Sequence, residues 1–207
     1  MDHFGGRGVY GHTGFMAALE KLDIPISSCA GSSAGAIVGG VMASGTNIQD
    51  WIKTITQVNT KQFWTPQSML QLLYRFGLLQ GRGVTGLSST AAAIRFLTGQ
   101  LAVQTFEDCI YPLSTVVVNL GECEKTVFDK GLLAPRIMAS AAMPGLYEPV
   151  EIEGQYYTDG AVIDLAPADA ICCRYQLDML LVHHLAQRDY TTGERECSEF
   201  CVTVIPR

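Results

Sequence analysis

The chain has 207 residues, 48% hydrophobic and 16% charged, and this composition predicts one globular domain over residues 1–207 rather than a disordered chain. The net charge of −6 and the lack of a Lys/Arg-rich run argue against nucleic acid as a partner, because phosphate binding needs a basic surface. No apolar run reaches the ~18 residues of a membrane span, and the scattered cysteines indicate reduced thiols in a cytoplasmic protein.

Helix and strand signals alternate along the chain and predict the α/β class. The expected elements, in chain order, are a helix over 12–22, a strand over 24–30, a helix over 34–43, a helix from Asn47, a helix from Thr65 to Gly77, a helix over 88–99, two strands within 112–128, a helix over 134–142, a hairpin over 150–160, a helix from Pro167 with Asp164 as its cap, and strands over 177–185 and 200–206.

The stretch from Gly31 to Gly35, GSSAG, has the G-x-S-x-G pattern with Ser33 at its centre. A strand is expected before it and a helix after it, which is the setting of a nucleophile held on a sharp turn. The glycines at 31 and 35 avoid Cβ clashes in such a turn. The alternatives are Ser32 as the nucleophile, or a helix start rich in small residues that carries no chemistry.

A second glycine cluster, FGGRGVYG, lies upstream and contains Gly5, Gly6, Arg7 and Gly8. Consecutive glycines expose backbone N–H groups that can converge on an oxyanion. The same cluster matches the spacing of a dinucleotide fingerprint. That motif needs a preceding strand and an acidic residue at the tip of the next strand, and both are missing here. We therefore expect an oxyanion loop and no cofactor.

A nucleophilic serine needs a group that accepts its proton. One option is a triad of Ser33, Asp159 and either His183 or His184, but the serine turn comes too early in the chain for the α/β-hydrolase order. The other option is Asp159 acting alone at the tip of a strand. Asp164 is the rival carboxylate, and its position before Pro167 favours a capping role instead.

Two further features allow more than one interpretation. Cys197 and Cys201, with the nearby histidines, allow a zinc site, but no CxxC or HxxxH spacing supports it, so no metal is expected. The apolar stretch over 63–79 suits a lid or a membrane-facing helix, but its spacing favours a core helix.

Taken together, three motifs resemble the patatin-like phospholipase family: GGRG at 5–8, GSSAG at 31–35, and Asp159-Gly160-Ala161, which forms a DGA motif. SAAMPGLYEPV before the aspartate and VIDLAP after it extend the resemblance over almost the whole chain. The resemblance implies a three-layer α/β/α fold with a central, mostly parallel sheet. It also implies hydrolysis of acyl esters in a lipid or phospholipid substrate, at a membrane surface.

For the site, the resemblance implies a Ser-Asp dyad with Ser33 as nucleophile and Asp159 as base, and an oxyanion hole from the Gly5–Gly8 backbone. Two departures from the family pattern matter. The apolar strand that normally precedes the glycine loop is absent, and the loop is shorter, so we expect a truncated N-terminus. A non-catalytic relative that binds lipid or protein is therefore one alternative function, and an α/β-hydrolase esterase with a Ser-His-Asp triad is the other.

Overall fold

The computed structural model describes residues 6–68, 70, 86–172, 174–175, 177–185 and 200–206. Its helices are α1 (Gly6–Lys21), α2 (Ala34–Ala43), α3 (Ile48–Gln57), α5 (Ala91–Gln100), α6 (Leu133–Ser140) and α7 (Asp169–Cys172), with short 3-10 turns η1 (Thr60–Gln62), η2 (Phe106–Asp108) and η3 (Gly160–Val162). Its strands are β1 (Cys29–Ser32), β2 (Gly86–Ser88), β3 (Leu113–Asn119), β4 (Glu124–Phe128), β5 (Gly145–Tyr147), β6 (Val150–Ile152), β7 (Gln155–Asp159), β8 (Met179–Leu185) and β9 (Phe200–Pro206).

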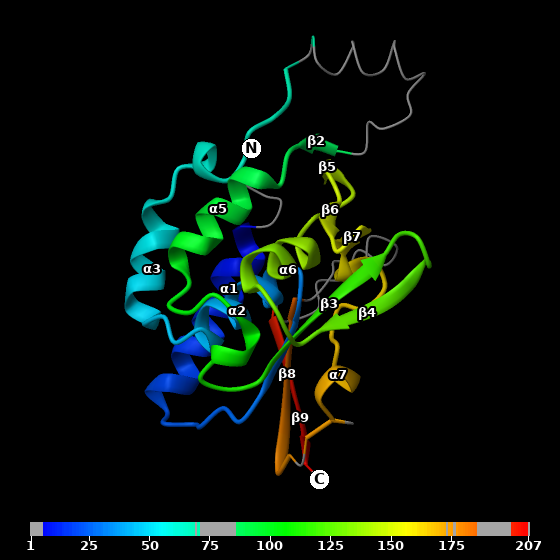
Figure 1. The fold of residues 1–207 in the computed structure, drawn as a ribbon. Coiled ribbons are helices and arrows are strands. Elements are labelled where there is room, and N and C mark those ends of the chain that lie inside the picture. Colours follow the sequence, from blue (N-terminus) through cyan, green and yellow to red (C-terminus); the bar gives the residue numbers. More distant parts are fainter. Residues whose placement is uncertain are drawn as a thin grey trace, which may run out of the picture.

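The main sheet has the order β1-β3-β7-β6, and β4 also pairs with β3 (Figure 1). Only the β1–β3 pairing of this sheet is parallel within the described ranges, and the other pairings are antiparallel. The expected α/β class is confirmed, but the expectation of a mostly parallel sheet is wrong. The reason is local: short turns join β3 to β4 and β6 to β7, and only antiparallel strands can be joined so closely.

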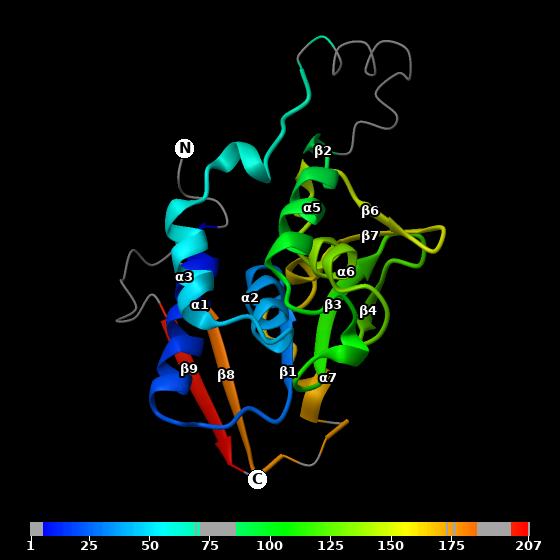
Figure 2. The same cartoon turned by 60° about the vertical axis from the view of Figure 1, so that its left-hand side comes forward.

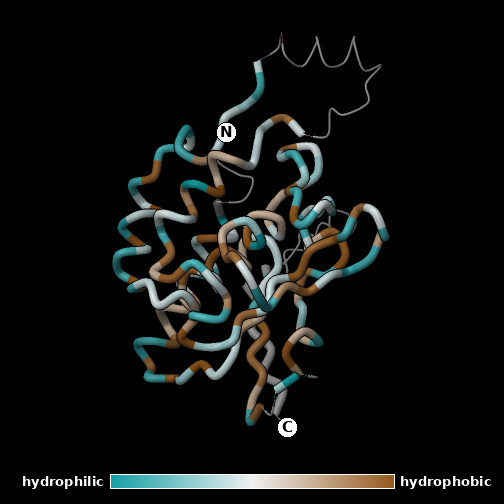
Figure 3. Tube along the Cα trace, viewed as in Figure 1, coloured by the Kyte–Doolittle hydropathy of each residue, from teal (hydrophilic) through white to brown (hydrophobic). Residues whose placement is uncertain are grey.

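Both faces of β3 are covered, since all of its residues are buried, and helices α2 and α6 pack against it. Leu113 and Val117 of β3 share one hydrophobic core with Val41 of α2 and Ile137 of α6. The short elements η3 and α7 contact β3 as well, and they lie outside that core. Figure 2 shows α1, α2 and α3 side by side, and Figure 3 shows mostly hydrophobic residues along the central strands.

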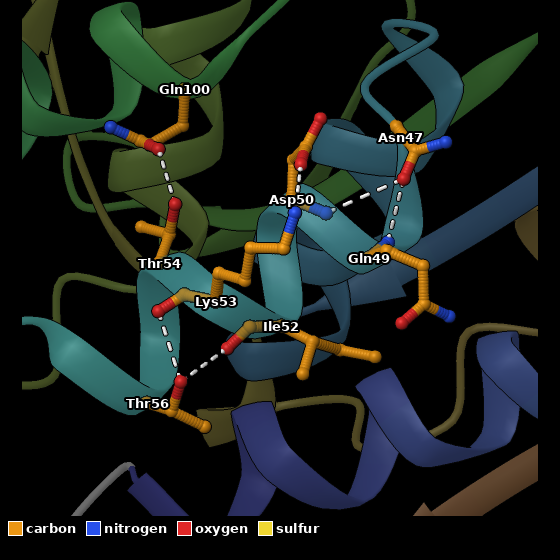
Figure 4. A network of polar contacts seen from close by, with 8 residues as sticks. All are labelled: Asn47, Gln49, Asp50, Ile52, Lys53, Thr54, Thr56 and Gln100. Atoms are coloured by element: carbon orange, nitrogen blue, oxygen red, sulfur yellow. Dashed lines mark hydrogen bonds and ion pairs between the residues drawn. The ribbon is translucent and has the colours of Figure 1, made fainter.

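Helix α3 begins where the sequence predicted. The Asn47 side chain caps it by accepting hydrogen bonds from the N–H groups of Gln49 (2.8 Å) and Asp50 (3.4 Å), as Figure 4 shows. Thr54 on the same helix donates to the Gln100 side chain of α5 (3.2 Å). A polar contact therefore links α3 to α5.

Helix α2 spans 34–43 as predicted, and the hairpin over 150–160 forms with a turn at Glu153 and Gly154. Both turn residues have positive φ (54° and 79°), as a tight two-residue hairpin requires. Helix α1, by contrast, begins at Gly6 and not at residue 12. Glycine is a weak helix former, but burial of Gly8 and packing of Val9 against the core outweigh that preference.

Two predicted helix starts are wrong. Pro66 forms an antiparallel bridge with Ser88, so the chain is extended there, and residues 69 and 71–77 of that expected helix lie outside the described part. Helix α7 begins at Asp169, and Asp164 does not cap it. The Asp164 carboxylate instead accepts from the Ala166 N–H (3.0 Å) and from Lys125 (2.6 Å). None of the described helices is long and apolar enough to cross a membrane.

Candidate active site

Ser33 occupies the turn between β1 and α2 in a backbone conformation that side chains rarely adopt (φ 53°, ψ −121°). A Cβ at Gly31 would lie 2.5 Å from the Gly35 carbonyl, so no other residue fits at position 31 without movement of the α2 backbone. A Cβ at Gly35 would have its nearest neighbour, a His12 ring nitrogen, at 3.8 Å. The first glycine of the motif is therefore required sterically, and the second is not.

Strand β3 brings the serine turn and the DGA motif together. It lies between β1 and β7, and its consecutive residues Val116 and Val117 pair with Ser32 and Asp159. The Ser33 hydroxyl donates to Asp159 Oδ2 at 2.8 Å, across 126 positions of sequence. The two residues predicted from separate motifs are thus in direct contact.

Asp159 ends β7 and is only 1% exposed. Burial raises the pKa of its carboxyl group, and hydrogen bonds from the Ala161 N–H (2.9 Å) and the Ser33 hydroxyl oppose that rise without cancelling it. A raised pKa makes the carboxylate a stronger proton acceptor. Gly160 is required here, because a Cβ would lie 2.1 Å from the Val116 carbonyl oxygen.

The glycine cluster differs from the expected loop. Gly5 lies outside the described residues, while Gly6, Arg7 and Gly8 form the first turn of α1. The first N–H groups of any helix point out of its end, where the helix dipole is positive. Helix α1 packs on α2, and His12 of α1 lies beside Gly35 near the start of α2. Gly8 precedes His12 by about one helical turn on α1.

The histidines form a separate pair. His183 Nδ1 of β8 lies 2.8 Å from His12 Nδ1, and its ring stacks on Phe15 (centroids 4.5 Å apart). Burial, and secondarily His183, lowers the pKa of His12 to about 4. Because Ser33 bonds Asp159 directly, no imidazole stands between them as a triad requires. The contact of His12 with His183 was not foreseen from the sequence.

A cavity of about 200 Å³ lies beside this site, between α1, β1, the α7 segment and β8. Ser32, His12 and His183 line it, but Ser33 and Asp159 do not. Within the described ranges no cluster of three or more His, Cys, Asp or Glu residues could hold a metal ion. Cys197 lies outside those ranges, as does the side chain of Cys201.

Two aromatic residues from the start of the 63–79 stretch are described, and both contact aromatic rings elsewhere in the fold. The Phe63 ring lies 5.9 Å from that of Phe96 on α5, and Trp64 meets Tyr147 edge-on at 5.0 Å. Phe63 packs against the hydrophobic core, as the core interpretation expects, but residues 63–68 are not helical. Residues 69 and 71–79 lie outside the described part of the chain.

Ser140, at the end of α6, is a site residue that the sequence interpretation did not single out. Its hydroxyl accepts from the Ser33 N–H at 3.1 Å. The signal available in the sequence was a run of small residues, Ala139 to Ala142, shortly before Pro144. Small residues at a helix end let other backbones approach closely.

Comparisons with known proteins agree with the motifs. A family model described as Patatin-like phospholipase matches residues 4–171, which include both Ser33 and Asp159. In the solved structures, VipD from Legionella pneumophila has the same fold, with a TM-score of 0.55 and 16% identity over 77% of this chain and 45% of that one.

Curated relatives match a similar stretch. An uncharacterized NTE family protein of Mycobacterium bovis is 30% identical over 165 residues, 79% of this chain and 42% of that protein. Patatin-like phospholipase domain-containing protein 6 of Mus musculus is 25% identical over 80% of this chain and 12% of that protein. Lysophospholipase NTE1 of Cryptococcus neoformans is 27% identical over 79% of this chain and 10% of that protein. The chain therefore spans less than half the length of these relatives.

Proposed function

Because the chain belongs to the patatin-like phospholipase family, we propose that it is a lipid acyl hydrolase with Ser33 as nucleophile and Asp159 as base. The observation that carries the proposal is the 2.8 Å hydrogen bond from the Ser33 hydroxyl to a buried carboxylate. Serine is a weak nucleophile unless an adjacent base accepts its proton, and Asp159 is in position to do so.

In the acylation step, Ser33 Oγ attacks the ester carbonyl carbon while its proton passes to Asp159 Oδ2. The carbonyl π electrons move to oxygen and form a tetrahedral oxyanion. When that intermediate collapses, the bond to the leaving alcohol breaks, and the alcohol takes the proton from Asp159. The serine then carries the acyl group as an ester.

The oxyanion needs N–H donors, and the Ser33 N–H is already used, since it bonds both the carbonyl oxygen and the hydroxyl of Ser140 at 3.1 Å. We assign the role to backbone N–H groups of the Gly5–Gly8 segment, of which Gly6, Arg7 and Gly8 form the first turn of α1. A helix N-terminus suits this role because its dipole favours negative charge. Removing one such donor typically costs ~10²–10³ in rate.

In the deacylation step, Asp159 accepts a proton from a water molecule, whose oxygen attacks the acyl ester. The fatty acid leaves, and the proton returns to Ser33 Oγ. The chemistry uses no cofactor and no metal ion, because the proton transfers need only the carboxylate.

We propose a lipid or phospholipid as the substrate, taken from a membrane surface. The name of the Cryptococcus relative, a lysophospholipase, supports a lipid ester. Directly after the DGA motif, Val162, Ile163 and Leu165 are 62%, 51% and 58% exposed. Apolar side chains this exposed and this close to Asp159 suit contact with lipid.

The test combines a fluorophosphonate probe with turnover of a nitrophenyl ester. We expect the probe to label Ser33 in the native chain, and Ser33→Ala to abolish both labelling and turnover without lowering the melting temperature. Asp159→Asn should keep the fold but lose turnover. Ser32→Ala is the matched control, and it should still be labelled.

Labelling of Ser32, or turnover by Ser33→Ala, would contradict the assignment of the nucleophile. A folded native chain that is neither labelled nor active would favour a non-catalytic relative that binds lipid or protein.

A further inference from the structure

The backbone of Ser33 needs support, because its φ of 53° and ψ of −121° are costly for a residue with a side chain. Its N–H lies 3.1 Å from both the carbonyl oxygen and the hydroxyl oxygen of Ser140. Ser140 is the last residue of α6 and is fully buried. Ser140, which is distant in sequence, therefore accepts both hydrogen bonds from the N–H of the proposed nucleophile.

The Ser140 hydroxyl also has a defined orientation. It donates to the Val116 carbonyl oxygen at 2.6 Å, so its proton points toward β3. Its lone pairs are then directed at the Ser33 N–H. Val116 is the β3 residue that pairs with Ser32 and against which Gly160 packs. The hydroxyl thus sits where β3, the serine turn and the DGA motif meet.

The same end of α6 also holds the aspartate. The Ala142 carbonyl oxygen accepts from the Asp159 N–H (3.1 Å) and from the Thr158 hydroxyl (2.6 Å). Residues 140–142 therefore contact Ser33 on one side and Asp159 on the other. Because these contacts hold the backbones of Ser33 and Asp159 at a fixed separation, the Ser33 hydroxyl can reach the Asp159 carboxylate.

We infer that Ser140 is a positioning residue of the hydrolase: its hydroxyl orients the Ser33 backbone so that Ser33 Oγ meets Asp159. This inference rests on the proposed function. Because the carbonyl contact of Ser140 remains when the hydroxyl is removed, we expect a partial loss. Net loss of one hydrogen bond corresponds to about tenfold in rate if it acts on the transition state.

The experiment compares Ser140→Ala with Ser44→Ala in the full chain. Ser44 is a matched control away from the site, with 1% exposure. Its hydroxyl donates to the Val41 carbonyl (2.7 Å) and accepts from the Ala102 N–H (3.1 Å), as the Ser140 hydroxyl donates to a carbonyl and accepts from an N–H, and it also lies 3.0 Å from the Thr46 hydroxyl. Both variants should lower the melting temperature by a similar amount.

On a nitrophenyl ester, we expect Ser140→Ala to lower kcat about tenfold with little change in KM, and Ser44→Ala to leave both unchanged. The pH profile is the second readout. The Ser33 hydrogen bond lowers the pKa of Asp159, so loosening it raises that pKa. The acid limb of kcat/KM should therefore move to higher pH in Ser140→Ala alone.

Equal kcat in Ser140→Ala and the native chain would overturn the positioning role, as would an equal loss in both variants without a shifted acid limb. If Ser140→Ala does not fold, Ser140→Cys, which keeps a weaker donor and acceptor, is judged by the same criteria. An inactive native chain would overturn the proposed function and this inference together, whereas an active native chain with an unaffected Ser140→Ala would overturn only the inference.

Discussion

Replacing Gly31 by alanine tests the geometry of the serine turn most directly. The new Cβ would lie 2.5 Å from the carbonyl carbon and oxygen of Gly35 and 2.6 Å from the Ala36 nitrogen, where ordinary contact begins at 3.4 Å. These are backbone atoms in the first turn of α2, so no side chain can rotate away. The turn must open by about 1 Å, and overpacking of this kind costs ~1–3 kcal/mol.

For a chain of this length, that loss lowers the melting temperature by about 2–12 °C. A displacement of ~1 Å at Ser33, the proposed nucleophile, should also cost ~10²-fold in turnover. The control is Gly35→Ala, whose Cβ would have 3.8 Å to its nearest neighbour. Alanine is the better helix former by up to ~1 kcal/mol, so this variant should be as stable as the native chain or more so. Thermal denaturation measures the stability of the two variants, and ester turnover measures their activity. Native stability and activity in Gly31→Ala would refute the steric reasoning.

Three further outcomes are expected. The acid limb of kcat/KM should lie above 3.8, the ordinary pKa of an aspartate carboxyl group, because burial raises the pKa of Asp159. A limb at or below pH 3.8 would contradict the proposed role of Asp159 as base. The pKa of His12 is lowered from 6.5 to about 4, so the free energy of unfolding should fall as the pH drops from 6.5 toward 4. In urea titrations, His12→Leu should make the free energy of unfolding depend less on pH over this range. An unchanged pH dependence would show that other groups cause it. A Cβ at Gly40 would lie 2.3 Å from Ile137 Cδ1, so Gly40→Ala should destabilise the fold by ~1–3 kcal/mol. Adding Ile137→Val, which removes that methyl group, should restore part of the lost stability. If the two substitutions change the free energy of unfolding additively in urea denaturation, the contact is not the cause.

The parts of the site that the sequence predicted are those with local chemistry. G-x-S-x-G around Ser33 and the Asp-Gly turn at Asp159 each carry their own backbone requirement, so a short window of sequence reveals them. The contact between the two, which the motifs led us to expect, is present at 2.8 Å. Helix α2 and the hairpin at Glu153 were predictable for the same reason, since their start and turn signals lie within the element.

What the sequence did not predict depends on partners distant in the chain. The first turn of α1 is helical because Gly8 is buried by tertiary packing, which overrides glycine's weak propensity. Pro66 extends because Ser88 pairs with it. Ser140 belongs to the site through contacts across 107 positions of sequence to Ser33. No periodicity or local motif encodes such contacts.

The position of β3 between β1 and β7 has a consequence for folding. Ser32 and Asp159 pair with neighbouring residues of β3. If β1 or β7 paired with β3 one residue out of register, the side chains of the shifted strand would point to the opposite face of the sheet. The chain must also close a loop of more than a hundred residues before the serine meets the aspartate. Recovery of esterase activity after dilution from denaturant would therefore report the register of the sheet, and it would follow the return of helical signal rather than accompany it.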